Sequence, residues 1–159
     1  MQTRIPMTPA GFEKVAADLR RHKEILKPNN IRDIEEAREH GDIKENSEFA
    51  DAKDRQALID GRIREMESKL SMADVIDITK IRPSDLVIFG VTVELEDVNT
   101  EEKLTYRIVG TEEADVRKGL ISYSSPIGTA LIGRKLDDEV KVVTPKGERF
   151  LTITAVHYR

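Results

Sequence analysis

Two acidic residues, Asp42 and Glu45, stand three positions apart in the run from Ala37 to Phe49. No large apolar cluster flanks them that could bury their carboxylates. If this run forms the turn between two helices, acids three apart can face one external target. This is the geometry that a protein would need to carry carboxylates into the active site of another molecule.

The same spacing has a structural explanation, and the residues alone leave it open. Asp42 and Glu45 fit a capping box, in which Asp42 is the N-cap of the following helix and Glu45 reaches back from the third helical position. Spacing by itself favours this cap. Asn46 and Ser47 offer substitute caps, which would leave both acids free to point outward.

Helical patterns lie on both sides of the acidic pair. The first helix is predicted to open with Thr8 as N-cap and Pro9 as its first residue, and to end near Gly41. Because Pro28 removes a backbone donor, we expect a kink or short break near residues 27–30. The apolar stripe of this helix comprises Phe12, Val15 or Ala16, Leu19, Leu26, Ile31, Ile34 and Ala37.

The second helix, from about Glu45 to Ala73, has one apolar seam at heptad spacing. The seam comprises Phe49, Ala52, Ile59, Ile63, Met66, Leu70 and Ala73, with Gln56 keeping the spacing. Two such helices joined by a short turn predict an antiparallel coiled-coil hairpin that projects into water. The heptads alone are equally compatible with a dimerisation coiled coil.

The second half of the chain has the period of strands. Short runs rich in β-branched residues, separated by turn residues, predict strands at 85–93, 104–109, 120–123, 139–143 and 150–156. Ser125 and Pro126 are placed as the N-cap and first residue of a short helix. The sequence thus predicts an α+β chain with a hairpin domain at 1–79 and, after a link broken at Pro83, an antiparallel sheet domain with one short helix at 80–159.

Composition limits the function further. The chain of 159 residues has 26 Lys+Arg and 30 Asp+Glu, a net charge of −4, so unaided DNA binding through a basic face is not expected. It has no cysteine, which excludes disulfides and thiolate metal sites. It has no long apolar run, so we expect a soluble cytoplasmic protein without membrane contact.

The run at 37–49 resembles the signature of the Gre family of bacterial transcript cleavage factors, GreA and GreB. The likeness continues through Tyr106–Gly110 and Ser125–Ile127 and covers essentially the whole chain. The unbroken pattern of the second helix and the ending at Val156–Tyr158 are more similar to GreA than to GreB.

This resemblance implies a fold and a partner. Such factors have an N-terminal coiled-coil hairpin and an FKBP-like C-terminal domain, and we expect a monomer that acts on bacterial RNA polymerase. The C-terminal domain docks at the rim of the polymerase secondary channel, and Ser124, Ser125, Pro126 and Ile127 match the docking region. The hairpin enters the channel, and the polymerase itself then cuts backtracked RNA, which frees arrested complexes. The resemblance therefore implies an elongation factor that is not an enzyme alone.

Roles for the acidic pair also follow from the resemblance. The protein is expected to have no cofactor of its own and to share Mg²⁺ with the polymerase active site. Asp42 would hold a weakly bound second metal, and Glu45 would orient or deprotonate the attacking water. Since Mg²⁺ takes only one or two protein carboxylates, such a site exists only when polymerase and RNA supply the other ligands.

Basic residues near the pair are expected to bind phosphates of the backtracked RNA 3′ end. These are Arg38, Lys53, Lys44 and Arg55. Their alternative role is an ordinary solvated face, because acids alternate with them along the chain. Phe49 stands where the family usually has tyrosine, so stacking on a base is retained and a hydroxyl hydrogen bond is lost.

Two other classes of function are less well supported. A passive channel-binding inhibitor with the same fold would need the acids to be absent or misplaced, whereas Asp42 and Glu45 are both in place. A peptidyl-prolyl isomerase or chaperone is suggested only by the FKBP-like fold, and fold does not imply function. That site needs an aromatic-lined pocket, and the chain has 4 Phe, 3 Tyr and no Trp.

Overall fold

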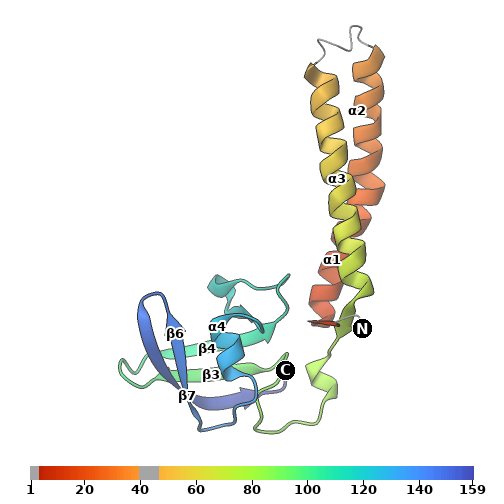
Figure 1. The fold of residues 1–159 in the computed structure, drawn as a ribbon. Coiled ribbons are helices and arrows are strands. Elements are labelled where there is room, and N and C mark those ends of the chain that lie inside the picture. Colours follow the sequence, from red (N-terminus) through yellow and green to blue (C-terminus); the bar gives the residue numbers. More distant parts are fainter. Residues whose placement is uncertain (1–3, 40–46) are drawn as a thin grey trace. The chain divides into compact units, whose positions relative to one another are not determined.

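The structure, a computed structural model, describes residues 4–39 and 47–159. Contacts divide the chain into two compact units, drawn in Figure 1. We call Phe12–Ala73 the hairpin unit, and Arg4–Gly11 together with Asp74–Arg159 the sheet unit. The boundary predicted at 79/80 lies further along the chain than this division. Within the two described ranges, no helix has the length and apolar character needed to cross a membrane.

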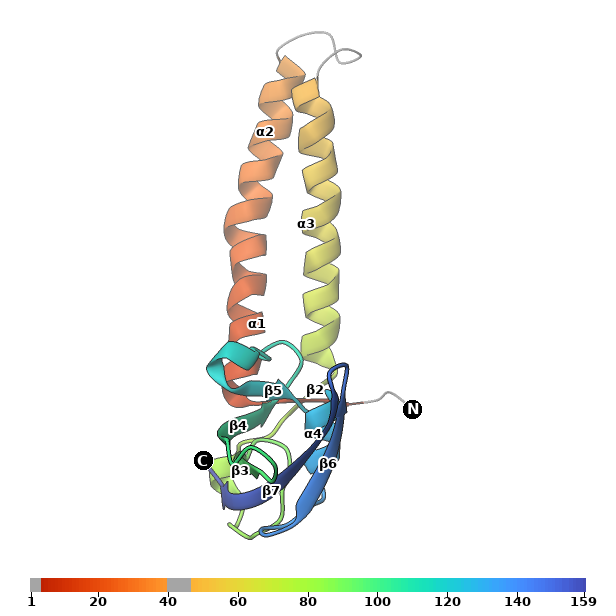
Figure 2. The same ribbon diagram turned by 90° about the vertical axis from the view of Figure 1, so that its left-hand side faces the viewer.

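The hairpin unit is built from helices that pack along one seam. Its elements are α1 (Pro9–Arg21, which starts in the sheet unit), the turn η1 (His22–Leu26), α2 (Lys27–Glu39) and α3 (Ser47–Ser71). Figures 1 and 2 both show α2 and α3 side by side. Ion pairs join Lys27 to Asp60 at 3.2 Å and Lys23 to Glu67 at 3.3 Å. The residue that comes earlier in the first helical segment is thus paired with the one that comes later in α3, so the two run in opposite directions. The predicted antiparallel hairpin is confirmed.

The first helix departs from the prediction just before Pro28. A π-helical turn occupies His22–Leu26, and the Lys27 N–H donates to the His22 carbonyl. The helix α2 then continues from Lys27 to Glu39. We expected a kink or short break near 27–30, and the structure has an irregular turn directly before this range and no break within it. Pro28 lies directly after the π turn, inside a continuous helical run, and removes one backbone donor there.

The sheet unit contains a five-stranded sheet in the order β5-β4-β3-β7-β6. Its strands are β3 (Thr92–Asp97), β4 (Lys103–Val109), β5 (Leu120–Ser122), β6 (Glu139–Thr144) and β7 (Gly147–His157). The pair β4 and β5 is parallel, and the other neighbouring pairs are antiparallel. The sheet is therefore mixed and not purely antiparallel as predicted. The reason is that β4 is joined to β5 through the 3₁₀ turn η3 (Val116–Lys118) and not by a tight hairpin.

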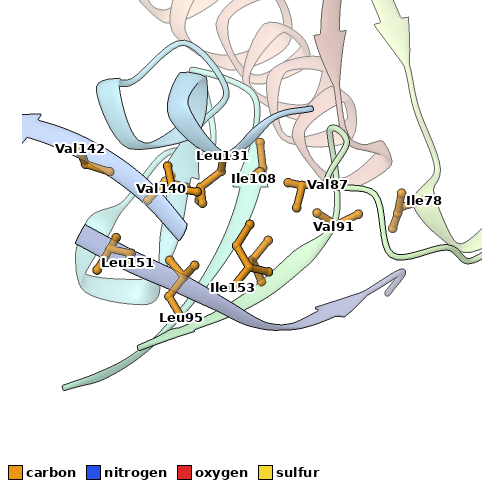
Figure 3. Packing of buried hydrophobic residues seen from close by; sticks show 12 residues of the cluster. Ile78, Val87, Val91, Leu95, Ile108, Leu131, Val140, Val142, Leu151 and Ile153 are labelled. Carbon is orange, nitrogen blue, oxygen red and sulfur yellow. The ribbon is translucent and has the colours of Figure 1, made fainter. Parts of the chain in front are cut away.

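The predicted short helix is present as α4 (Pro126–Leu131), and its Leu131 lies within the core of the sheet unit (Figure 3). The buried cluster comprises Ile78, Val87, Val91, Val93, Leu95, Ile108, Ile121, Leu131, Val140, Val142, Leu151 and Ile153. Full burial of one such side chain contributes about 1.5–3 kcal/mol relative to leaving it exposed. This cluster makes the sheet unit a packed body on which exposed groups can be held.

The strand predicted at 85–93 is wrong in its position. The observed strand β3 begins only at Thr92, and the preceding segment forms a single bridge between Leu86 and Lys135. Val87 and Val91 are fully buried in this irregular segment, and Gly90 turns the chain with φ +96. A buried apolar run does not by itself distinguish a strand from an irregular segment.

A second, two-stranded sheet was not predicted. It joins β1 (Ile5–Met7) to β2 (Ala73–Val75), and the Ile76 N–H extends the pairing by donating to the Met7 carbonyl at 2.9 Å. Strands of three residues are too short to show a period of two. The N-cap predicted at Thr8 is confirmed, since its Oγ1 accepts the Gly11 N–H at 3.0 Å.

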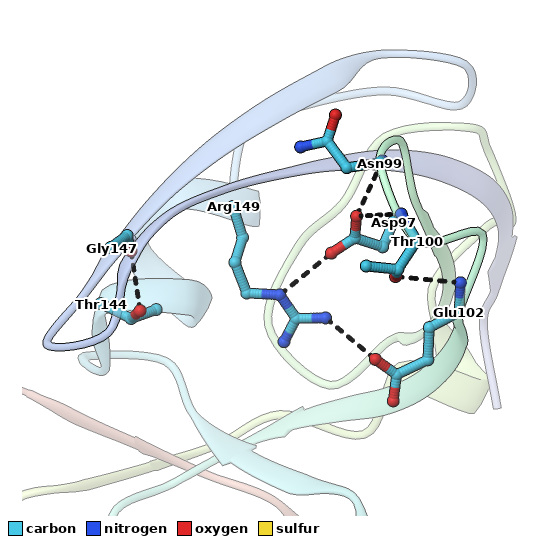
Figure 4. A network of polar contacts seen from close by, with 7 residues as sticks. All are labelled: Asp97, Asn99, Thr100, Glu102, Thr144, Gly147 and Arg149. Carbon is cyan, nitrogen blue, oxygen red and sulfur yellow. Dashed lines mark hydrogen bonds and ion pairs between the residues drawn. The ribbon is translucent and has the colours of Figure 1, made fainter.

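A buried carboxylate closes the loop between β3 and β4 and ties it to β7 (Figure 4). Asp97 is 4 % exposed, and its Oδ1 accepts the N–H groups of Asn99 at 2.9 Å and Thr100 at 3.1 Å. Its Oδ2 accepts from Nε of Arg149 at 3.1 Å, and Nη2 of Arg149 reaches Glu102 at 3.3 Å. The backbone N–H groups of Thr100 and Asn99, with a smaller effect from Arg149, lower the pKa of Asp97 below its usual range.

We expect Asp97→Asn to lower the free energy of unfolding at neutral pH but much less in acid. A carboxyl whose folded pKa is depressed stabilises the fold above its unfolded pKa of about 3.9, and this stabilisation is lost as the pH falls through the folded pKa. Urea unfolding at pH 7, 5 and 3 measures it, with the exposed Asp85→Asn as control. An equal difference between wild type and Asp97→Asn at pH 7 and pH 3 would contradict the prediction.

Candidate functional site

The acidic pair lies between the two helices of the hairpin in sequence. Asp42 and Glu45, with Lys44, fall outside the described residues, so their roles stay predictions. The helix α2 ends at Glu39 and α3 begins at Ser47. Two separate regions are therefore candidate functional surfaces. One is formed by the helix ends that flank residues 40–46 in the hairpin unit, and the other is the exposed start of α4 in the sheet unit.

Small side chains line the seam where α2 and α3 approach residues 40–46. Ala37 is 3 % exposed and Ala52 is 1 % exposed. The spacing between packed helices depends on the side chains at their contact, and alanine permits a short one. Of the larger buried side chains of the seam, Ile34 lies one turn before Ala37 on α2, and Ile63 and Met66 lie further along α3.

A buried amide fixes the seam close to these alanines. Nδ2 of Asn30 donates to the Ala52 carbonyl at 2.9 Å, and Asn30 is only 5 % exposed. Ile31, which was predicted to occupy the seam, is 41 % exposed. Sequence reasoning preferred the apolar residue, although positions 30, 34 and 37 follow helical spacing equally well. A buried Asn in a helix seam restricts the register of the two helices.

Two of the predicted RNA-binding residues lie on the exposed surface of the hairpin unit. Arg38 is exposed in the last turn of α2. Lys53 is exposed on α3, where its Nζ donates to Oε1 of Gln56 at 2.8 Å. Neither belongs to the seam, so both cations are accessible to an anion in solvent.

The third described cation, Arg55, has different surroundings. It lines a hollow of about 270 Å³ between α2 and α3 with Ala37 and the carboxylates of Asp33, Glu36, Glu48 and Asp51. Four acids and one guanidinium leave a negative surface, which is unfavourable for a phosphate. Among the described residues no group of His, Cys, Asp and Glu is arranged to hold a metal ion, so this hollow is not a metal site.

The four predicted docking residues are brought together at the start of α4, and two of them are needed by the fold. Oγ of Ser125 accepts the Gly128 N–H at 3.1 Å and donates to the Ser122 carbonyl at 2.6 Å, which confirms Ser125 as N-cap. Ile127 packs on the core. Ser124 and Pro126 are exposed, whereas Ser125 and Ile127 are half-buried, so Ser124 and Pro126 are the most accessible of the four to a partner.

The start of α4 also leaves no room for a side chain at one position. A Cβ on Gly128 would lie 2.1 Å from the Ser122 carbonyl oxygen, a distance that the backbone itself would have to relieve. The turn from Ser122 to Gly128 is therefore closely packed, and Ser124 and Pro126 are presented on a rigid support.

Comparison with known families assigns both halves of the chain. Residues 5–75 match the family described as "Transcription elongation factor, N-terminal", and residues 82–158 match "Transcription elongation factor, GreA/GreB, C-term". Curated relatives named Transcription elongation factor GreA, from Francisella tularensis subsp. novicida (strain U112) and subsp. tularensis (strain WY96-3418), are each 49 % identical over 156 residues, which is 98 % of this chain and 98 % of theirs.

Solved structures of similar proteins include Gfh1, GreA factor homolog 1, of Thermus thermophilus. It is 31 % identical, covers 97 % of this chain and 99 % of its own, and has a TM-score of 0.43. The identity with the GreA relatives over nearly the full length of both chains, together with the matches in both halves, decides the assignment: this chain belongs to the GreA/GreB family of transcription elongation factors.

Proposed function

We propose that this chain enters the secondary channel of bacterial RNA polymerase and stimulates the polymerase's intrinsic cleavage of backtracked RNA, which rescues arrested complexes. The observation that carries the proposal is the 49 % identity to transcription elongation factor GreA over 98 % of the chain. The acidic pair of this chain, Asp42 and Glu45, supplies the chemistry that such a role needs. The test is addition of the protein to a stalled elongation complex, with shortened RNA as the expected product.

The donor set of the pair suits Mg²⁺. Carboxylate oxygens are hard ligands, and Mg²⁺ uses one or two of them together with water and substrate phosphates. Asp42 would hold the ion, and Glu45 would orient or deprotonate the attacking water. A second Mg²⁺ bound there would stabilise charge on the phosphodiester and lower the pKa of its water. Since the chain contributes only this pair, hydrolysis belongs to the polymerase and the chain is no nuclease alone.

The described part of the hairpin supports delivery of the pair into a confined space. Its helices pack closely through Ala37 and Ala52, and the buried Asn30 restricts their register. A register shift would displace the residues between α2 and α3, and displacement of about 1 Å already costs a catalytic group up to about 10²-fold. Arg38 and Lys53 are exposed near this end of the helices and would meet the phosphates of the extruded RNA.

We expect the double change Asp42→Asn and Glu45→Gln to lower cleavage stimulation by orders of magnitude. Asn is as good an N-cap as Asp, and Gln fills the third position of a capping box, so the change removes the charges and keeps the capping groups. The unfolding free energy should change by no more than about 1 kcal/mol. RNA cleavage and polymerase binding are measured together, with and without added Mg²⁺. Normal cleavage by the variant would show that the acids are structural.

We expect Arg38→Ala with Lys53→Ala to weaken action on backtracked complexes while the fold is kept, because both side chains lie outside the seam. The loss is electrostatic, so it should be larger at low ionic strength and shrink as salt is added, because the Debye length falls from about 30 Å at 0.01 M to about 8 Å at 0.15 M. Arg64→Ala, at an exposed arginine further along α3, is the control. Cleavage equal to wild type at every salt concentration would mark these residues as an ordinary solvated face.

We expect Pro126→Arg to weaken polymerase binding at least tenfold, since Pro126 is exposed at the start of α4 and a long cation there would obstruct a docked surface. Thermal unfolding should change little, because the N-cap bonds of Ser125 do not involve the Pro126 side chain. Thr154→Arg, at an exposed position of β7, is the matched control. Binding curves for labelled polymerase compare the two, and equal affinities would place docking elsewhere.

A further inference from the structure

A carboxylate from the sheet unit lies at the start of the first helix. The Thr8 hydroxyl donates to Oε2 of Glu113, 105 positions later in the chain, and its Oγ1 also accepts the Gly11 N–H at 3.0 Å. Thr8 is 1 % exposed. The N-cap of α1 is therefore bonded both to its own helix and to the loop that follows β4.

The close approach of this loop depends on two glycines. A Cβ on Gly11 would lie 2.6 Å from Oε2 of Glu113, and one on Gly110 would lie 3.0 Å from the Pro6 carbonyl oxygen. The loop itself is closed by the Glu113 N–H, which donates to the Gly110 carbonyl at 3.1 Å. A side chain at Gly11 would have to displace the carboxylate, so this position and Glu113 are matched to each other.

Electrostatics favour the arrangement as well. The first N–H groups of a helix have no partner within the helix, and a negative charge near them is stabilising. The first turn of α1 contains no acidic residue of its own. Glu113 supplies that charge from a distant part of the sequence.

The helix held in this way is shared between the two units. Residues Arg4–Gly11 belong to the sheet unit, and the chain enters the hairpin unit at Phe12, inside α1. We propose that Glu113 is a positioning residue, which fixes the start of α1 in the sheet unit, and that the action of the hairpin on a stalled elongation complex depends on this attachment. The second half of this inference rests on the proposed function.

The experiment uses the full-length chain with Glu113→Ala, Glu113→Gln, Gly11→Ala and the double variant Gly11→Ala/Glu113→Ala. Glu139→Ala, at an exposed carboxylate of β6, is the control. Hydrogen exchange of the Gly11 amide reports the attachment without reference to function. Cleavage of RNA in stalled complexes and polymerase binding report its consequence, and thermal unfolding shows that each variant is folded.

In Glu113→Ala the Gly11 amide should exchange about tenfold faster or more, the effect of losing a hydrogen bond to a charged group. Cleavage should fall about tenfold or more, as for a displaced catalytic group, while polymerase binding stays within about twofold. Gly11→Ala should reproduce the faster exchange, measured at the amide of position 11, and the loss of cleavage, because its Cβ expels the carboxylate. The double variant should be no worse than either single one. Glu113→Gln keeps an acceptor for Thr8 and should recover most of the activity.

Unchanged Gly11 exchange in Glu113→Ala would overturn the attachment, and faster exchange with normal cleavage would overturn the positioning role. Additive losses in the double variant would show that Gly11 is not there to admit Glu113. If the wild-type chain itself stimulates no cleavage, the proposed function fails and the positioning role fails with it. The exchange data then still decide whether Glu113 holds α1.

Discussion

The narrow seam between α2 and α3 is the constraint on which the hairpin unit depends. Two helices that project into water share only one face, so few side chains are buried, namely Asn30, Ile34 and Ala37 from α2 with Ala52, Ile63 and Met66 from α3. Ion pairs such as Lys27 to Asp60 and Lys23 to Glu67 flank the seam. Exposed pairs of this kind contribute only about 0–1 kcal/mol each. The side chains buried in the seam, together with the contacts that hold the starts of its helices, therefore determine most of the structure of the hairpin.

A thin seam also explains why a polar residue is placed within it. An all-apolar seam of two helices tolerates slippage between registers, whereas the Asn30 amide finds the Ala52 carbonyl in one register only. A buried amide costs stability if its bond is lost. If the residues between α2 and α3 carry the chemistry, as the proposed function requires, a fixed register matters more than the small burial gain of another apolar side chain.

The sheet unit differs from the hairpin unit in that its core is large enough to hold irregular segments in place. Val87 and Val91 are fully buried although they precede β3, and Asp97 holds the β3–β4 loop through backbone N–H groups and Arg149. The exposed start of α4 rests on this body through Ile127 and the N-cap Ser125. The exposed groups at the start of α4 are thus supported by packing that does not involve those groups themselves.

The features that sequence reasoning predicted are those encoded locally. Periodicity of 3.6 or 2 located the hairpin helices and four of the five strands of the large sheet, and the local chemistry of Thr8-Pro9 and Ser125-Pro126 located two helix starts. The misplaced strand at 85–93 and the π turn at His22–Leu26 have no local signature that separates them from their neighbours. The parallel pair β4–β5, the three-residue strands β1 and β2, and the bond from Thr8 to Glu113 depend on residues far apart in the chain, which a single sequence does not reveal.

Under the proposed function, Asp42 and Glu45 form an incomplete site that polymerase and RNA complete. Four carboxylates line a hollow with Arg55 near the helix ends, and among the described residues no group of such side chains is arranged to hold a metal ion. Under the proposed function, a factor that bound Mg²⁺ tightly by itself would need further carboxylates beside Asp42 and Glu45, and each would repel the RNA phosphates that must approach. Two carboxylates avoid that conflict. Under that proposal the remaining ligands would be phosphate oxygens and polymerase groups, so the ion would be held only where RNA is in position to be cut.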